Sequence, residues 1–300
     1  MSETQAHNLL VLNTGFTVAV DGPGQRMVVY LKGCNMCCPW CAAPESMAHR
    51  PEVLFYSGRA DEPVRLSEAC PMGAVRVGPD GVRRDTLVCA SCDDFPCLKS
   101  NSRAFELAGG LMSVQAIVDK AARYRSFYSK LGGVTIGGGE PACQFDGVAE
   151  LLAGLREQSI HTAVETNGSE PRLPELFPLI DLLFIDLKHP DDDQAARITG
   201  QGNRVTLDNI RHRYEQKGAM VVRICLVPGY NADDKTVRAF GEVLSSIGRL
   251  NIELLPFHRR GEVKWRALGR EMPAADAAEP TNEHLQFARK MLSIYGLNVS

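Results

Sequence analysis

Three cysteines stand at a spacing that suits an iron–sulfur cluster. Cys34, Cys38 and Cys41 follow the pattern C-x3-C-x2-C. Three thiolates can hold three irons of a 4Fe-4S cubane and leave the fourth iron open, whereas a structural zinc site is closed by a fourth protein ligand. Cys37 could close a zinc site, but it adjoins Cys38, which is a poor arrangement for tetrahedral coordination. We therefore predict an open 4Fe-4S cluster on the other three cysteines, with zinc as the alternative.

An open iron predicts a chelating ligand. S-adenosylmethionine (SAM) can bind such an iron through its amino and carboxylate groups. An electron from the reduced cluster then breaks a sulfonium C–S bond of SAM and leaves a carbon radical. The cysteine spacing therefore favours radical chemistry over a purely structural metal.

The remaining cysteines also point to metal ligation. The chain has ten cysteines, and eight of them fall within residues 34–41 and 70–97. Clustering at short spacings is typical of metal ligands, and disulfides are rare in the cytosol, where we expect this protein. The net charge of −3 and the pI of about 6.2 predict neither a nucleic-acid nor a membrane-surface partner. We find no apolar run long enough for a membrane span and no basic start of a signal peptide, so the predicted location is cytoplasmic.

The elements that must position these cysteines alternate between strands and helices. Such alternation predicts a parallel sheet with catalytic groups at the C-terminal ends of its strands. We predict an α/β fold, a partial (β/α)6 TIM-like barrel, with a complete eight-stranded barrel as the alternative. The expected strands are Arg26–Lys32, Gly133–Gly137, His161–Glu165, Leu182–Lys188, Met220–Val227 and Asn251–Leu255, and the expected helices are Ser113–Lys130, Asp146–Gln158, Asp191–Thr199, Leu207–Lys217 and Asp233–Gly248.

A cysteine-rich stretch interrupts this alternation. Residues 45–110 contain many Cys, Pro, Gly and Asp residues and little helical periodicity. We predict that they form a small inserted domain, and that residues 1–44 and 111–300 form the barrel. Residues 270–283 are expected to be a surface loop.

Several residues at predicted strand ends suit a bound ligand. Gly138 and Gly139 follow a strand and would let the backbone approach a ligand closely, although an ordinary glycine turn is the alternative. Asp186 and Lys188 stand two residues apart and should face the barrel interior together, either to bind SAM or to pair with each other. Arg223 should also point inward, toward an anion or a structural carboxylate.

The order of motifs along the chain resembles the glycyl-radical-enzyme activating enzymes of the radical SAM superfamily, of which pyruvate formate-lyase activating enzyme is the best-known member. The resemblance covers nearly the whole chain. It is carried by Asp21-Gly-Pro-Gly-Gln-Arg26, Val28-Val-Tyr-Leu-Lys-Gly-Cys34, the cysteine triplet, Gly133-Val-Thr-Ile-Gly-Gly-Gly-Glu-Pro141, Glu165-Thr-Asn-Gly168, Asp186-Leu-Lys188, Arg223 with Val227-Pro-Gly-Tyr-Asn231, and Leu255-Pro-Phe-His258.

The resemblance implies a set of site residues. The triplet would hold the SAM-binding cluster, and Glu165 with Thr166 would form a monovalent-cation site near SAM. The residues implied for SAM are Trp40, Gly138, Gly139, Glu140, Asp186, Lys188, Arg223 and His258.

Larger members of the family carry ferredoxin-like inserts with further clusters. Cys70, which precedes Pro71, looks like the end of one ferredoxin run, and Cys89, Cys92 and Cys97 look like the start of another. In ferredoxins the last cysteine of one run ligates the other cluster, so these four would make one auxiliary 4Fe-4S cluster. Zinc on the same four residues is the alternative.

The implied function is abstraction of a hydrogen from a glycine of a partner glycyl-radical enzyme by a 5′-deoxyadenosyl radical. A flavodoxin- or ferredoxin-type protein would supply the electron. Ala42 and Ala43 stand where the family usually has His-Asn, which favours an alternative substrate, either a small molecule or a peptide. A non-catalytic iron–sulfur or zinc protein is a third possibility.

Overall fold

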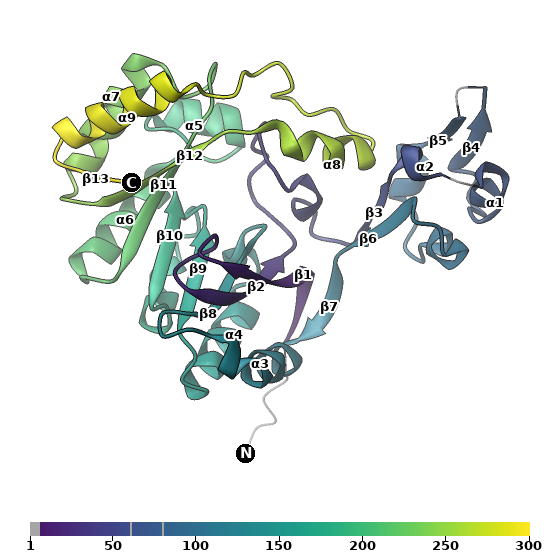
Figure 1. Cartoon of the computed structure of the whole chain (residues 1–300), viewed down its shortest axis with the longest axis horizontal. Coiled ribbons are helices and arrows are strands. Elements are labelled where there is room, and N and C mark those ends of the chain that lie inside the picture. The colour runs from purple at the N-terminus through teal and green to yellow at the C-terminus, as the bar shows by residue number, and fades with distance from the viewer. Residues whose placement is uncertain (1–6, 61, 80) are drawn as a thin grey trace.

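A nine-stranded sheet forms the body of the protein in a computed structural model that describes residues 7–60, 62–79 and 81–300 (Figure 1). Six of its strands run parallel in consecutive order, as the sequence predicts for a partial barrel. These strands are β2 (Gln25–Leu31), β8 (Gly133–Gly138), β9 (Thr162–Thr166), β10 (Leu182–Asp186), β11 (Met220–Leu226) and β12 (Asn251–Pro256).

Three strands that we did not predict extend this sheet. The short β13 (Asn298–Val299) lies parallel to β12. At the other side β1 (Asn8–Val18) pairs antiparallel with both β2 and β7 (Gly110–Ser113). The sheet remains open, with β13 and β7 at its edges, so the alternative of a closed eight-stranded barrel is wrong.

Helices cover the outer face of the sheet and enclose the main apolar core. Val118, Leu151, Ile210 and Phe240 pack from four helices against buried residues of the strands. The helices of this layer are α3 (Val114–Arg123), α4 (Phe145–Glu157), α6 (Arg204–Glu215), α7 (Asp234–Ser245) and α9 (Asn282–Ile294). Two shorter helices, α5 (Asp192–Thr199) and α8 (Glu262–Ala267), pack through Ile198 and Trp265 on a second apolar cluster beside the cysteine loop.

The first of these helices is shorter than predicted. Ser113 caps its start, as expected, by accepting a hydrogen bond from the backbone of Ala116 at 3.2 Å. Helix α3 ends at Arg123 because the chain then turns, and the rings of Tyr124 and Phe127 pack on Phe16 of β1 at centroid distances of 4.7 and 4.9 Å. Short α8 and the longer α9 were not predicted.

The cysteine-rich stretch forms an arm beside the barrel (Figure 1). A ribbon of β3 (Glu52–Phe55) and β6 (Phe105–Ala108) leads into it. A second pair, β4 (Val75–Gly78) and β5 (Gly81–Arg84), and two short helices, α1 (Pro63–Glu68) and α2 (Thr86–Ala90), complete it around an apolar cluster of its own. The ribbon lies within the predicted insertion, whose boundaries at residues 45 and 110 stay a prediction.

Among the residues that the structure describes, no helix has both the length and the apolar character needed to cross a membrane.

Candidate functional site: a cysteine-lined cavity at the strand ends

The loop that carries the first cysteines begins where β2 ends and is closed at its base. The backbone N–H of Gly33 donates to Ser46 O at 2.7 Å, and that of Cys34 donates to Met47 O at 3.0 Å. The side chain of Trp265 in α8 donates to Cys41 O at 3.0 Å. Backbone hydrogen bonds across the two ends of the loop and one bond from α8 therefore hold the loop in place.

Three of the four cysteines in this loop face one cavity of about 450 Å³, and the fourth does not. Cys34, Cys38 and Cys41 line the cavity. Cys37 is exposed and does not line the cavity, and its thiol lies 3.3 Å from Thr199 O. Cys37 is therefore separated from the other three cysteines, which agrees with the predicted ligand set of Cys34, Cys38 and Cys41.

The three cavity thiols are strongly shielded from water. Burial raises the pKa of Cys34 to about 12 and the pKa values of Cys38 and Cys41 to about 11. Backbone N–H groups work in the opposite direction: that of Met36 donates to the Cys34 sulfur at 3.4 Å, and that of Ala43 lowers the pKa of Cys41. Such buried thiols become thiolates when a metal replaces their protons.

Most of the other predicted site residues line the same cavity. Trp40 is buried and packs edge-on against Tyr230, with ring centroids 5.2 Å apart. The predicted residues that line the cavity are Trp40, Gly138, Gly139, Glu165, Thr166, Asp186, Lys188 and His258, whereas Glu140 and Arg223 lie behind its wall.

The two glycines join β8 to the cysteine loop. Gly138 has a φ of +102°, and a Cβ on Gly139 would lie 2.3 Å from Gly33 O. The backbone of Gly139 donates to Leu31 O at 2.8 Å, and that of Glu140 donates to Gly33 O at 2.8 Å. Glycine is needed here because the ends of two strands approach closely, a reason that does not itself require a ligand.

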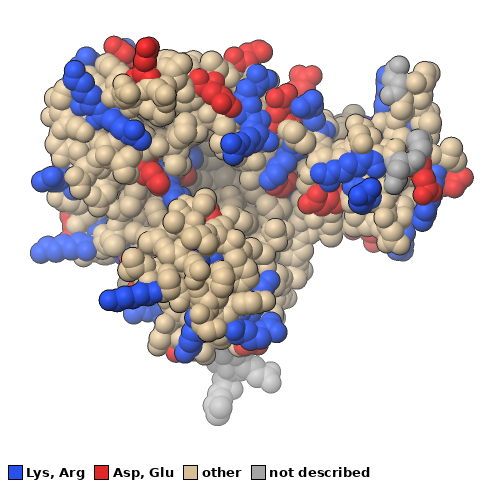
Figure 2. Space-filling model, viewed as in Figure 1, with Lys and Arg blue, Asp and Glu red and all other residues tan. Residues whose placement is uncertain are grey.

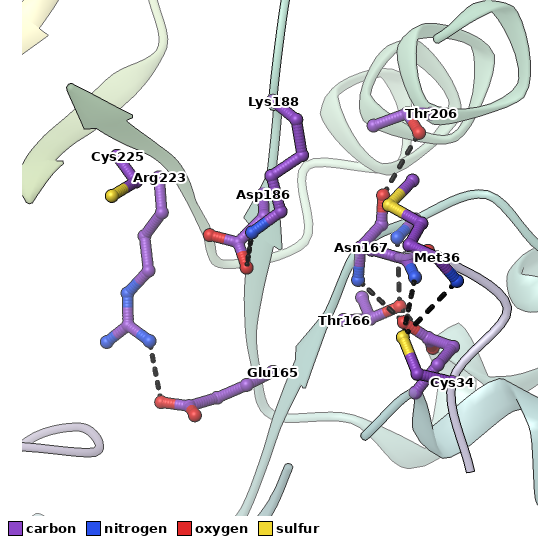
Figure 3. A network of polar contacts seen from close by, with 12 residues as sticks. Cys34, Met36, Glu165, Thr166, Asn167, Asp186, Lys188, Thr206, Arg223 and Cys225 are labelled. Carbon is purple, nitrogen blue, oxygen red and sulfur yellow. Dashed lines mark hydrogen bonds and ion pairs between the residues drawn. The ribbon is translucent and has the colours of Figure 1, made fainter. Parts of the chain in front are cut away.

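Asp186 and Lys188 form an ion pair at the cavity wall. Their carboxylate and ammonium groups are 2.9 Å apart, and both side chains are mostly shielded from solvent. Burial alone lowers the pKa of Lys188, but the adjacent Asp186 outweighs it and the net pKa lies above the usual range. The contact with Asp186 therefore favours the charged form of Lys188. The mutual ion pair, which is the alternative to a contact with SAM, is therefore present, and both residues line the cavity (Figure 3).

Glu140 acts on the cavity through its neighbours. Its carboxylate is fully buried and accepts hydrogen bonds from Thr166 Oγ1 at 2.6 Å, Asn167 N at 2.7 Å and Ala142 N at 3.0 Å. These bonds fix the end of β9 against the turn after β8. The family resemblance implies that Glu140 contacts SAM, but its side chain lies behind the residues that line the cavity.

Arg223 lies inside the barrel in a group of carboxylates (Figure 3). Its guanidinium pairs with Glu165 at 2.6 Å and Glu253 at 2.6 Å and covers the ring of Phe184 at 3.8 Å. Burial lowers the pKa of Arg223, but Glu165 and Asp186 outweigh this effect and raise it. Arg223 already donates to the Glu165 carboxylate, and the Thr166 hydroxyl already donates to Glu140. A monovalent cation bound by Glu165 and Thr166 would have to compete with both interactions.

Some cavity residues were not assigned a role from sequence. Asn167 Nδ2 lies 2.8 Å from Asn35 Oδ1 and 3.9 Å from the Cys34 sulfur (Figure 3). Cys225 and Phe257 also line the cavity. The motifs Glu165-Thr-Asn-Gly168 and Leu255-Pro-Phe-His258 contained two of these residues and could have indicated them, whereas Cys225 carried no such signal.

The four predicted auxiliary cysteines meet in the arm. Cys70, Cys89, Cys92 and Cys97 all line one narrow cavity of about 20 Å³, together with Arg84. Burial raises the pKa of Cys89, and burial with the neighbouring thiols raises the pKa of Cys97 to about 11. The structure thus brings Cys70 beside cysteines that follow it by 19 residues or more.

Both cysteine sets offer the donor chemistry of an iron–sulfur cluster. Three thiols around one cavity suit a cubane with one open iron, and four thiols suit a closed centre. Within the described parts of the chain, no three His, Cys, Asp or Glu side chains are already arranged around a single metal ion. The fit therefore rests on the thiols and their burial.

Comparison with known families agrees with this donor set. Residues 95–240 match the radical SAM superfamily, and residues 20–69 match a 4Fe-4S single cluster domain. The second match contains the cysteine triplet and ends before Cys70. An iron–sulfur cluster and SAM are therefore supported as cofactors.

Relatives match along nearly the whole chain. The 4-hydroxyphenylacetate decarboxylase activating enzyme of Clostridioides difficile is 33% identical over 294 residues, which cover 95% of this chain and 93% of the relative. The isethionate sulfite-lyase activating enzyme of Oleidesulfovibrio alaskensis is 33% identical over 265 residues, which cover 85% of each chain.

A solved structure supports the same fold at lower sequence identity. A radical SAM methyltransferase from Sphaerobacter thermophilus superposes with a TM-score of 0.57 at 17% identity, covering 96% of this chain and 68% of that one. With the fold, the cysteine-lined cavity and the full-length relatives in agreement, the chain belongs to the glycyl-radical-enzyme activating enzymes of the radical SAM superfamily.

Proposed function

We propose that this protein cleaves SAM reductively and uses the resulting radical to abstract a hydrogen atom from a glycine Cα of a partner glycyl-radical enzyme. The observation that carries the proposal is the meeting of Cys34, Cys38 and Cys41 on one cavity beside the Asp186–Lys188 pair. Its full-length relatives are named activating enzymes, which favours a protein partner over a small molecule.

The three cysteines would hold the cluster. When bound, a cubane with one open iron supplies the electron that breaks the sulfonium bond of SAM and yields the 5′-deoxyadenosyl radical. Their burial excludes water from the reacting groups, and the N–H donors of Met36 and Ala43 stabilise the thiolate form.

Asp186 and Lys188 would bind the amino-acid end of SAM. The ammonium of SAM suits the Asp186 carboxylate, and the carboxylate of SAM suits the Lys188 ammonium. Because the pair already exists, each charge keeps a partner when the ligand is absent, which limits the cost of holding ions in a shielded wall.

The other cavity residues would shape the rest of the ligand site. Gly138 and Gly139 present backbone groups at its edge, Trp40 supplies an apolar wall, and His258 lies exposed near the opening. Glu140 and Arg223 would act indirectly, by holding Thr166 and Glu165 in place.

The arm would carry an auxiliary 4Fe-4S cluster on Cys70, Cys89, Cys92 and Cys97. We propose the division of the chain into a barrel of residues 1–44 and 111–300 and an insertion of residues 45–110. A flavodoxin- or ferredoxin-type protein would supply one electron per SAM cleaved.

The test is SAM cleavage by the anaerobically reconstituted full chain with dithionite as reductant. We expect 5′-deoxyadenosine to form, as followed by mass spectrometry, and to be lost in Cys34→Ala but kept in Cys37→Ala. The latter is a matched control because its thiol lies outside the cavity. Equal product from Cys34→Ala and wild type would overturn the assignment.

A further inference from the structure

A second pocket opens where the arm meets α8. It has a volume of about 230 Å³ and is lined by Arg50, Arg84, Arg270, Glu52 and Cys89 among others. It shares four residues with the narrow cavity of the four arm thiols: Val53, Arg84, Cys89 and Phe95. The pocket therefore adjoins the cavity of the auxiliary cysteines.

The lining of this pocket carries positive charge. Three arginines face one glutamate, which leaves two positive charges. In this count Glu52 offsets Arg270, with which it pairs at 2.5 Å, and it also pairs with Lys32 at 3.0 Å. In Figure 2, Lys and Arg side chains gather along α8 and on the near face of the arm, with a few carboxylates between them. An acidic surface would complement this region.

The junction that forms the pocket is tightly packed. Arg84 donates to Val53 O at 2.5 Å and to Ala267 O at 2.8 Å, so it ties the arm to α8. Gly269 has a φ of +72°, and a Cβ there would lie 2.1 Å from the Thr86 methyl group. A pocket built on such contacts is formed before any partner arrives, which favours specific docking.

The same short helix reaches the main cavity. Ala267 at the end of α8 accepts from Arg84, and Trp265, two residues earlier, donates to Cys41 O at 3.0 Å. One helix of six residues thus contacts both cysteine sites. A protein bound at the pocket would lie directly against Cys89 and next to this connection.

We propose that the arginine-lined pocket is the docking surface for an acidic one-electron carrier protein of the flavodoxin or ferredoxin class. The inference rests on the proposed function, which requires such a donor. The reduced carrier loses one electron and the iron–sulfur protein gains it, and no bond, proton or leaving group moves in that step.

The experiment measures binding of an acidic flavodoxin to the full reconstituted chain by calorimetry at low and high salt. In the variant Arg50→Glu with Arg270→Gln we expect about tenfold weaker binding at low salt, and a smaller difference at high salt. Arg238→Glu is the matched control, because Arg238 is exposed on α7, far from the arm in Figure 1. It should bind within about twofold of wild type.

A second readout separates docking from chemistry. SAM cleavage driven by dithionite should stay within about twofold of wild type in the double variant, while cleavage driven by limiting flavodoxin should fall about tenfold. If the double variant unfolds, Arg50→Glu alone serves, since Arg50 is exposed and its guanidinium donates to Ala90 O at 2.8 Å. Absence of dithionite-driven cleavage in wild type would refute the proposed function and leave the binding result interpretable.

Three outcomes would overturn the docking surface. The first is equal flavodoxin affinity in wild type and the double variant, and the second is an equal loss of affinity in Arg238→Glu. The third is that wild type binds inorganic phosphate and the double variant does not, while both bind flavodoxin equally. The last outcome would assign the pocket to a small anion.

Discussion

Substitutions in the ion pair between Asp186 and Lys188 should affect protein stability and SAM binding in different ways. Replacing Lys188 with Met removes the ammonium and leaves the Asp186 carboxylate in a shielded wall without its partner. Replacing Asp186 with Asn as well removes both charges. We expect the single variant to be less stable than the double variant, and both to bind SAM weakly.

The magnitude follows from the geometry. At 2.9 Å and an effective dielectric of about 20, the attraction is about 6 kcal/mol before the cost of removing both ions from water. The Lys188 side chain is 17% exposed and that of Asp186 28%, which places the pair between the buried and the surface cases. We expect Lys188→Met to lower the free energy of unfolding by about 2 kcal/mol. Loss of a charge-assisted hydrogen bond should weaken SAM binding about tenfold to hundredfold.

Urea unfolding and calorimetric SAM titration measure the two effects. The double variant should return to within about 1 kcal/mol of wild-type stability. The pair of Arg204 and Asp192 is a matched control, since its nitrogen and oxygen are also 2.9 Å apart but the Arg204 side chain is 82% exposed. Arg204→Met should cost less than about 1 kcal/mol.

Two results would contradict the role assigned to this ion pair. Wild-type SAM affinity in Lys188→Met would show that the ammonium does not contact the ligand. A double variant no more stable than the single variant would show that Asp186 gains nothing from its partner.

Three further predictions concern the cavity thiols and the carboxylate of Glu140 behind the cavity wall. Cys38→Ser should lose about four irons per chain after reconstitution and Cys37→Ser none, by iron assay, and equal losses would contradict the ligand set. In the metal-free protein, burial raises the pKa of Cys38 from the ordinary 9.0 to about 11. The unfolded chain therefore loses this proton at lower pH than the folded chain does. The free energy of unfolding should fall as pH rises from about 9 to about 11. Urea midpoints across this range test it, and a slope that Cys38→Ala does not reduce would contradict it. Glu140→Gln should lower the free energy of unfolding by about 1–3 kcal/mol, because an amide cannot accept the hydrogen bonds from Ala142, Thr166 and Asn167 together. A loss below about 0.5 kcal/mol in urea unfolding would argue against this hydrogen-bond network.

The parallel strands were predictable because each is a short apolar run between helical patterns. Their order along the chain is also their order in the sheet, so residues at their C-terminal ends meet at one edge. This is why Asp186 could be placed beside the cysteine loop before its contacts were known. Strand β1 was missed because its pairing is antiparallel and lies outside the strand–helix alternation.

The partners of Arg223 could not be predicted. Alternation indicates that this side chain points inward, but not which carboxylate it meets. The register of the sheet decides this: Arg223 lies opposite Asp186 on one side and Glu253 on the other, and Glu165 reaches it from the strand beyond. Several acidic residues on neighbouring strands would have been equally consistent with the sequence.

The proposed function requires that the cysteine-lined cavity makes a radical that is passed to a glycine of a protein partner. The most direct measurement is EPR of a glycyl-radical enzyme encoded in the same genome, after anaerobic incubation with this protein, SAM and dithionite. We predict a glycyl doublet that is lost when Cys34 is replaced by Ala. We also predict deuterium in 5′-deoxyadenosine when the partner's glycines carry deuterium. A doublet of equal intensity with Cys34→Ala, or 5′-deoxyadenosine without a doublet in any encoded partner, would contradict it.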